Sequence, residues 1–436
     1  MSSGNVSERH LRRARRAWYM YDWANSAFPT TVLTVLLGPY LTQIAHRAAD
    51  AEGMLTVVGI RVDADAYYPF LASLSVLLQL LLLPAIGVLA DARGWKKPLL
   101  LFFAYFGALA TVGLYWLEEE RYWLGGALFV TANLCFGASM VMYNAFLPEL
   151  AAPHERDAVS SRGWAVGYIG GGTLLGLNML FLAFAEHWGF VLEHAVRLCL
   201  ASAGFWWALF TLIPAVGLPH SPAVPRRPGT ARHGWKELVR TLSSFRAYPQ
   251  ALLFLGAYFF YNDGVQTVIA LSGQFASQEL RLPLQTITGT LLMVQFVAFA
   301  GALGFGWLAQ RVGTKRALLW SLVLWIGVLL YSGVGLRTAS EFVAVAGVIA
   351  LVLGGTQALS RSLFSQYIPS GREAGYFSFY ELSERGSSWL GPFLFGAVLQ
   401  WSGSYRWAIG VVTLLFLGGA FLLLLLRYPP PGRGEE

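Results

Sequence analysis

Long apolar runs alternate with short polar segments along almost the whole chain. Twelve of these runs approach the length that an α-helix needs to cross a bilayer, which is roughly 20 residues. We place them at residues 18–42, 67–90, 98–117, 122–147, 164–185, 194–217, 248–271, 286–309, 317–336, 342–364, 387–401 and 405–427. The runs are continuous and do not alternate with a period of two, so they predict helices and not the strands of a membrane barrel.

Composition supports the same conclusion. Of the 436 residues, 56% are hydrophobic and only 13% are charged, whereas about a quarter of a soluble domain is charged. This balance excludes a soluble enzyme, a disordered chain and a disulfide-rich secreted scaffold. The sequence therefore predicts an all-α integral membrane protein with twelve transmembrane helices.

The positive charges give an orientation. The net charge is +7, but the basic residues lie in short loops between apolar runs, so topology explains them better than a nucleic-acid partner. With both termini cytoplasmic, the cytoplasmic segments hold all of the lysines and arginines except Arg47, Arg61, Arg121, Arg197, Arg281, Arg337 and Arg406. The positive-inside rule favours this arrangement, and we expect a multi-pass protein of a bacterial inner membrane. The first run is too long for the apolar part of a signal peptide, so it should remain as a span.

A polar, proline-containing stretch divides the chain. Residues 218–247 separate six runs from six, which predicts an N-terminal six-helix bundle over 1–217, a cytoplasmic linker over 218–247 and a C-terminal six-helix bundle over 248–436. Landmarks recur across this stretch, among them Tyr21-Asp22 and Tyr261-Asn262-Asp263. Internal repeats of this kind are typical of transporters whose solute site lies near mid-membrane between the halves.

Two loops carry a second repeated motif. Residues 87–97 read GVLADARGWKK, and residues 306–316 read GWLAQRVGTKR. Both resemble the signature loop of the major facilitator superfamily, with Gln310 in the place of Asp91. We interpret these loops as a cytoplasmic gate closed by ion pairs and helix dipoles, the alternative being ordinary positive-inside decoration. The gate candidates are Gly87, Asp91, Arg93, Gly94, Lys96, Lys97, Glu149, Arg162, Gln310, Arg311 and Arg361.

A narrower resemblance covers residues 17–427. The segment 21–28, YDWANSAF, is similar to the hallmark of the major facilitator branch that includes the fungal vacuolar amino-acid effluxer, and 162–172, 261–267 and 354–361 are similar to the same branch. The resemblance implies two six-helix pseudo-repeats, a rocker-type transporter and, by analogy with the fungal member, amino-acid export. The identity of the solute is the property that can least be inferred from the family, because function depends on the site and not on the fold.

Two acids lie inside the predicted spans, Asp22 and Asp263. A charge at the centre of a membrane helix costs about 2.5–3.5 kcal/mol on insertion scales, so such residues usually face a cavity and serve a function. Either could take up and release a proton during transport. The alternative for Asp22 is an interfacial position paired with Arg13 or Arg16.

Aromatic and amide side chains complete the candidate site. They could stack on a solute or hydrogen-bond to it, although helix packing explains each of them alone. The solute and proton candidates are Tyr21, Asp22, Trp23, Asn25, Asn144, Tyr261, Asn262, Asp263, Gln266, Gln295 and Gln357. A cation that could pair with the carboxylate of an amino acid is not evident within the spans, and Arg361 qualifies only if its helix is displaced inward.

The sequence thus predicts a monomeric secondary active transporter that moves a small polar solute by alternating access. Amino-acid export and proton coupling are the favoured details, and an exporter of drugs or other amphipathic solutes is the alternative. From another class, a membrane-embedded sensor or channel remains open. We find no HExxH, GxSxG or phosphate-binding loop, so we expect no enzyme, catalytic residue, cofactor or metal.

Overall fold

The computed structural model describes residues 2–57, 59–118, 120–221 and 248–427, and these residues are mostly helical. Clustering of the chain gives two compact units. The first unit comprises Met1–Ile86, Ala92–Tyr143 and Val166–Ala223, and the second comprises Gly87–Asp91, Asn144–Ala165 and Val224–Glu436. The predicted linker falls mainly on residues outside the described ranges, and the division into bundles at 218–247 stays a prediction.

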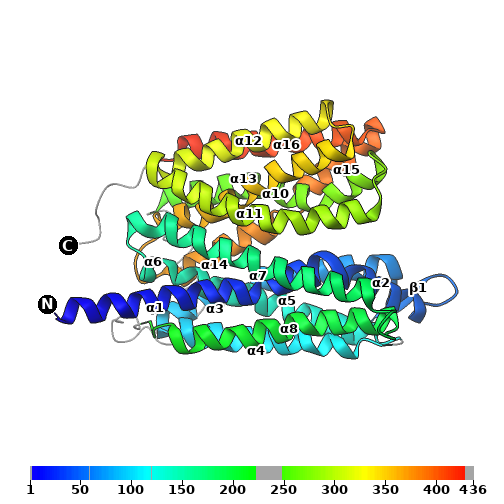
Figure 1. Ribbon diagram of the computed structural model, residues 1–436, viewed down its shortest axis with the longest axis horizontal. Helices are drawn as coiled ribbons and strands as arrows, with labels where there is room; N and C mark the ends of the chain where they lie inside the picture. Colours follow the sequence, from blue (N-terminus) through cyan, green and yellow to red (C-terminus); the bar gives the residue numbers. More distant parts are fainter. Residues whose placement is uncertain (1, 58, 119, 222–247, 428–436) are drawn as a thin grey trace. The chain divides into compact units, whose positions relative to one another are not determined.

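The first half of the chain supplies the helices of the first unit and two short segments of the second. Its elements are α1 (Ser2–Asn25), the π-helix η1 (Phe28–Leu36), α2 (Leu37–Ala48), β1 (Met54–Val57), β2 (Ile60–Asp63), α3 (Ala64–Arg93), α4 (Lys96–Gly113), η2 (Leu114–Trp116), α5 (Tyr122–Ala145), α6 (Leu147–Leu150), η3 (Pro153–Glu155), α7 (Arg156–Phe184) and α8 (Leu192–Gly217). Helix α8 packs on both α1 and α4 (Figure 1). Trp207 of α8 is buried against Phe28 of η1 and Phe136 of α5.

Between residues 248 and 427 the described elements are helices. They are α10 (Pro249–Gln278), α11 (Leu284–Val312), α12 (Thr314–Val334), α13 (Ala339–Ser365), α14 (Glu373–Gly386), α15 (Leu390–Ser402) and α16 (Tyr405–Leu425). Helix α11 lies along α13, and α16 packs on α10, α12 and α15 (Figure 1). At the centre of this packing, Trp325 stacks on Phe416 and donates a hydrogen bond to Thr356.

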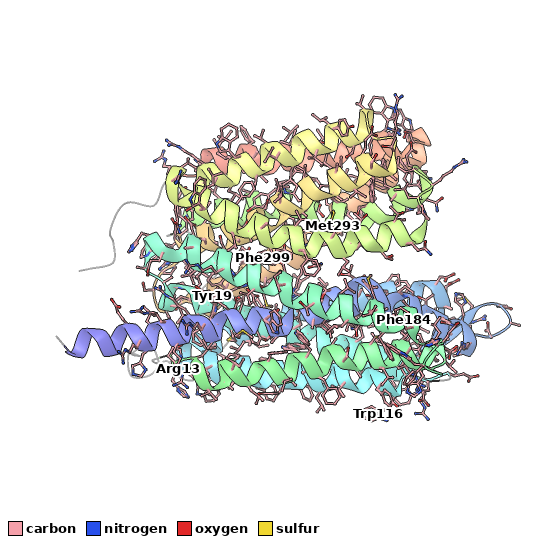
Figure 2. All side chains as sticks on the ribbon, viewed as in Figure 1. Arg13, Tyr19, Trp116, Phe184, Met293 and Phe299 are labelled. Atoms are coloured by element: carbon pink, nitrogen blue, oxygen red, sulfur yellow. The ribbon has the colours of Figure 1, made fainter. Side chains whose placement is uncertain are left out.

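Nine helices of the described residues are long and apolar enough to cross a membrane. All twelve predicted runs overlap helix, but the count of twelve spans stays a prediction. The runs outside the nine are the first and the eleventh, which are broken into shorter helices, and the seventh, whose α10 carries Asn262, Asp263 and Gln266. Large apolar side chains remain exposed on the outer helix faces, among them Trp116 and Phe184 (Figure 2), as a lipid solvent requires.

Two local features were not predicted. The run 18–42 changes from α-helix to π-helix where Pro29 removes a backbone donor. Between α2 and α3, β1 and β2 form an antiparallel hairpin whose register pairs Leu55 with Val62. Its β-branched residues favour strands, but the hairpin lies in a short polar connection where we expected only a loop.

Candidate functional site

The first signature loop lies against the start of α14. The Asp91 carboxylate accepts hydrogen bonds from the backbone nitrogens of Ala374 at 3.0 Å and Gly375 at 2.7 Å. A helix leaves its first N–H groups without intrahelical partners, and its dipole favours an anion there. A Cβ atom at Gly87 would lie 2.4 Å from the carbonyl oxygen of Ala374, so glycine permits this close approach.

Each signature loop contains a glycine with a positive φ angle. Gly94 and Gly313 turn the chain with φ of +66° and +88°, a region that side chains other than glycine rarely adopt. Arg93 is exposed and lies over Trp95 at 4.5 Å, and Arg311 lies over Trp307 at 3.8 Å. Each loop therefore presents an arginine stacked on a tryptophan, although the two rings are placed differently in sequence.

The lysines that follow these loops contact the ends of distant helices. Lys97 is buried and its Nζ donates to the carbonyl oxygen of Leu218, the C-cap residue that follows α8, at 2.7 Å. In the second unit, Lys315 Nζ donates to the carbonyl oxygen of Leu426, the C-cap residue that follows α16, at 2.6 Å. A cation at a helix C-terminus is electrostatically favoured. Lys96 is also buried.

The remaining gate candidates are placed differently. Glu149, Arg162 and Gln310 are exposed. Sequence reasoning missed Asp157, which is buried in the first turn of α7 and accepts hydrogen bonds from Thr314 Oγ1 at 2.7 Å and Ser362 Oγ at 2.6 Å. The predicted fifth span begins only at residue 164, whereas α7 begins at Arg156, so Asp157 lies outside the predicted span but inside the helix.

In the first unit, Asp22 is buried on α1. The Tyr143 hydroxyl donates to Asp22 Oδ2 at 2.5 Å, and Trp18 stacks on the Tyr143 ring with centroids 4.4 Å apart. Arg13 and Arg16, the partners considered for an interfacial Asp22, are exposed (Figure 2 labels Arg13). The described contacts therefore place Asp22 in the packed interior of this unit.

The other candidates from this stretch lie near Asp22 in sequence, on the same helix α1. Tyr21 and Asn25 are buried, and Trp23 stacks on Trp206 of α8 with centroids 5.4 Å apart. The helix approaches α7 closely, since a Cβ atom at Gly170 would lie 2.6 Å from the carbonyl oxygen of Trp23. Glycine at position 170 thus permits the close packing of α1 on α7.

In the second unit, Asn262 and Asp263 hydrogen-bond to the two helix ends that flank a break between α14 and α15. The break separates α14 from α15 at residues 387–389. Asn262 Nδ2 donates to the carbonyl oxygen of Glu384 at 2.9 Å, and the backbone nitrogen of Gly391 donates to Asp263 Oδ2 at 2.7 Å. The Asn262 amide thus pairs with a carbonyl group near the end of α14, and the Asp263 carboxylate pairs with an N–H group at the start of α15.

Asp263 is fully buried, with 0% of its surface exposed. Its other oxygen, Oδ1, has no hydrogen-bond partner among the described residues. A carboxylate that can still accept a hydrogen bond in a dry interior is costly, so this oxygen is the chemically available part of the group.

The next feature is the buried cation Arg361, for which the sequence did not decide between a place inside the bundle and one at its edge. Arg361 lies four residues before the end of α13 and is wholly buried, with 0% exposure. Its Nε donates to Ser160 Oγ at 2.9 Å, one terminal nitrogen to the Ser160 carbonyl oxygen at 2.8 Å, and the other to Asn144 Oδ1 at 3.3 Å. The ring of Trp164 lies 5.4 Å from the guanidinium carbon.

Two acids of α14 were missed altogether. Glu381 is buried and accepts from Asn144 Nδ2 at 2.7 Å, and Glu384 accepts from the Tyr258 hydroxyl at 3.1 Å. The sequence predicts an eleventh span that begins at residue 387 or a few residues earlier, whereas helix already begins at Glu373, so the polar sequence of α14 hides its buried acids. Asn144 therefore bridges a buried cation and a buried anion within the second unit.

The last candidates line the same unit. Tyr261 is buried and hydrogen-bonds Ser360 at 2.7 Å between the two oxygens. Gln357 is buried and its Oε1 has no hydrogen-bond partner among the described residues, while Gln266 and Gln295 are half-buried. The arrangement can offer charged and neutral hydrogen-bonding groups to a solute, and the described residues contain no cluster of metal-ligating side chains.

Comparison with known proteins agrees with this architecture. The human organic anion transporter MFSD10 (TETRAN) has a similar fold, with a TM-score of 0.71 at 15% identity over 95% of this chain and 99% of that one. The MFS-type transporter YxiO of Bacillus subtilis (strain 168) is 30% identical, and the match covers 95% of each chain. Autophagy-related protein 22 of Pyricularia oryzae is 26% identical over 91% of this chain and 74% of the relative.

The family model described as "Vacuole effluxer Atg22 like" matches residues 10–429. The resemblance inferred from the segments 21–28, 162–172, 261–267 and 354–361 is thereby confirmed, as is the integral, multi-pass character of the protein. The chain belongs to the Atg22-like family of vacuole effluxers, with the fold of the major facilitator superfamily.

Proposed function

We propose that this protein is a secondary active transporter that moves a small polar solute by alternating access, and that the solute is an amino acid. The observation that carries the proposal is the wholly buried Arg361, which shares the Asn144 side chain with the buried Glu381. Ionised side chains in membrane helices are costly and usually mark the path of a solute or an ion. Arg361 also supplies the cation that the amino-acid interpretation lacked.

The relatives support the same direction. The matching family is one of vacuole effluxers, and export is therefore the proposed direction. An exporter of apolar drugs is less well supported, because its site would need few buried charges. The structural neighbour MFSD10 is an organic anion transporter, so organic anions belong in the solute screen as the competing class.

Proton coupling is proposed for Asp22 and Asp263. Each is a buried acid, on α1 and on α10 respectively, and each accepts a short hydrogen bond. A buried carboxylate favours its neutral form, which makes proton uptake and release accessible during a transport cycle. We propose that the protein resides in a bacterial inner membrane with both termini cytoplasmic and works as a monomer.

A ligand screen followed by transport tests this function. The purified protein would be screened for thermal stabilisation by amino acids, peptides, sugars, organic anions and cationic drugs at pH 5.5 and 7.5. A ligand at about 100 times its Kd should stabilise by about 2.7 kcal/mol. We expect amino acids to stabilise the protein and to exchange across proteoliposome membranes; stabilisation by another class alone would discard the amino-acid assignment.

The coupling is tested separately. Asp22→Asn and Asp263→Asn should each weaken proton-driven accumulation while leaving solute counterflow, which needs no proton gradient, less affected. If both variants kept the accumulation and pH dependence of the wild type, neither acid would be the proton carrier.

A further inference from the structure

We propose that Arg361 and Glu381 bind the α-carboxylate and the α-ammonium of a zwitterionic amino acid, which takes the place of the Asn144 side chain between them. The inference rests on the proposed function and adds to it the groups that recognise the solute. In the conformation described here, Asn144 of α5 contacts both charged groups.

The guanidinium is held in a fixed orientation that leaves one nitrogen exchangeable. Ser160 accepts hydrogen bonds from Nε and from one terminal nitrogen of Arg361, at 2.9 and 2.8 Å. The other terminal nitrogen donates to Asn144 Oδ1 at 3.3 Å, a longer distance than either bond to Ser160. A carboxylate forms shorter and stronger bonds with a guanidinium than a neutral amide does, so a solute carboxylate competes well for this nitrogen.

The opposite end of the amide contacts the anion. Asn144 Nδ2 donates to Glu381 Oε1 at 2.7 Å, while Arg385 Nε lies 3.4 Å from Glu381 Oε2. The Asn144 amide therefore presents an acceptor to a buried cation and a donor to a buried anion. An amino acid has the same two functions in its carboxylate and ammonium, with full charges in place of dipoles.

The charge balance of the cluster selects among solutes. When Glu381 and Glu384 are ionised, as the binding of an ammonium at Glu381 requires, their charges are matched by those of Arg361 and Arg385, and Arg385 Nε lies 3.4 Å from Glu381 Oε2. A zwitterion adds no net charge, whereas an organic anion or cation would leave one charge uncompensated in a buried environment, which is costly. This argument favours an amino acid whose side chain is uncharged.

Aromatic rings around the cluster support an apolar side chain. Tyr258 and Tyr380 stack with centroids 4.4 Å apart, and Phe364 stacks on Tyr380 at 5.4 Å. The Trp164 ring lies beside the guanidinium of Arg361. Rings in these positions would contact aliphatic or aromatic side chains favourably.

The experiment compares matched ligands on the full-length protein. The probes are the L-amino acids with uncharged side chains, each tested with its amide, which lacks the carboxylate, and its 2-oxo acid, which lacks the amine. Affinity is measured by thermal stabilisation in detergent and by competition with counterflow in proteoliposomes. We expect the wild type to bind the amino acid at least about tenfold more tightly than either analogue, a difference of about 1.4 kcal/mol.

Two substitutions should remove one preference each. Arg361→Gln should abolish the preference for the amino acid over its amide and keep that over the 2-oxo acid. Glu381→Gln should do the reverse. Arg156→Gln is the control for loss of a partly buried arginine, since Arg156 donates to the Ser365 carbonyl oxygen and not to Asn144; it should keep both preferences. If Arg361→Gln did not fold, Arg361→Lys would replace it and should weaken the carboxylate preference, because an ammonium offers no bidentate fork.

Asn144→Ala tests the exchange itself. Removing an internal competitor should strengthen amino-acid binding, by up to about tenfold. The matched control is Asn133→Ala, which removes a buried amide bonded to Ser75 in the first unit and should leave affinity unchanged or lower. Weaker binding by Asn144→Ala, equal to that of the control, would overturn the exchange.

The outcomes separate this inference from the proposed function. If no amino acid binds the wild type, both are overturned. If amino acids bind but Arg361→Gln, or its Arg361→Lys replacement, and Glu381→Gln retain the discrimination of the wild type, the amino-acid function stands and the assignment of these two residues is overturned.

Discussion

Asp22 and Asp263 are the two acids within the predicted spans, yet their hydrogen-bond donors differ in kind. Asp22 accepts a hydrogen bond from a side chain, the Tyr143 hydroxyl, in the first unit. Asp263 accepts one from a backbone nitrogen, that of Gly391, at the start of α15 in the second. A side chain can rotate to another partner, whereas a backbone group at a helix terminus cannot, so the two acids are expected to contribute unequally to stability.

Removal of Asp263 should have the largest effect. Asp263→Ala leaves the Gly391 N–H without its acceptor, and a buried unsatisfied group costs about 1–3 kcal/mol; we expect a value near the top of that range. Asp263→Asn keeps an acceptor oxygen and should recover most of the loss. The measurement is thermal melting of the purified protein in detergent, and equal melting of wild type and Asp263→Ala would show that the contact contributes nothing.

The signature glycines provide a second comparison between the repeats. A Cβ at Gly87 would lie 2.4 Å from the backbone oxygen of Ala374, and one at Gly306 would lie 2.4 Å from Oγ and 2.5 Å from Cβ of Ser161. Rotation of the Ser161 side chain moves its hydroxyl but not its Cβ, so both substitutions require a shift of the backbone, and Gly87→Ala and Gly306→Ala should each cost about 2 kcal/mol. Melting temperatures of the two variants, measured beside the wild type, check this, and an unchanged melting temperature in either variant would contradict it.

Loss of the Asp22 contact should be smaller. Tyr143→Phe removes the donor and Asp22→Asn the charge, and each should destabilise by about 1 kcal/mol. The double variant should cost less than the sum of the two, because the residues share one bond. Because asparagine keeps an acceptor oxygen, strict additivity in this double-mutant cycle would indicate that the charge of Asp22 adds nothing to the hydrogen bond.

The smallest effect on stability is expected at Asp50, where an aspartate accepts backbone hydrogen bonds in contact with solvent. Like Asp263, it accepts backbone hydrogen bonds, here from Met54 and Glu52, but it is exposed. The Met54 bond is the main cause of a pKa below the usual value for an aspartate, with Glu52 and Arg61 contributing less. A lowered pKa means that the stabilisation is present above the unfolded-state pKa and is lost as the pH falls through the folded-state value.

Hydrogen exchange measures this effect. The protection factor of the hairpin amides at 50–57 should fall slightly as the pH is lowered through the titration of Asp50, and Asp50→Asn should remove that dependence. A protection factor that follows pH equally in the variant would assign the change to another group.

The fold could be predicted from the sequence because the features that determine it lie in short stretches of the chain. Apolar runs of helical length, and glycines such as Gly94 and Gly313 where the chain must turn with positive φ, are visible in short windows. The π-helix at Phe28–Leu36 and the hairpin before α3 were not predicted, since each departs from the expected element over only a few residues.

The candidate site was only partly accessible, because its chemistry depends on partners far away in sequence. The polar sequence of α14 reads as a loop, and Glu381 becomes a buried acid only through packing that brings Asn144 to it. Similarly, no window around Arg361 reveals that Ser160 will hold its guanidinium. The acids of α1 and α10 were found, since a lone charge in an apolar run is conspicuous by itself.

The lysines after the signature loops have a consequence for the history of the chain. Lys97 and Leu218 lie within the first unit, and Lys315 and Leu426 within the second, so each unit fastens the end of its own last helix. A gene that encoded a single six-helix repeat would already encode both partners of this contact. Duplication of such a gene would therefore yield two copies that each keep their terminal helix in place, leaving residues such as Arg361 and Glu381 free to diverge between the copies.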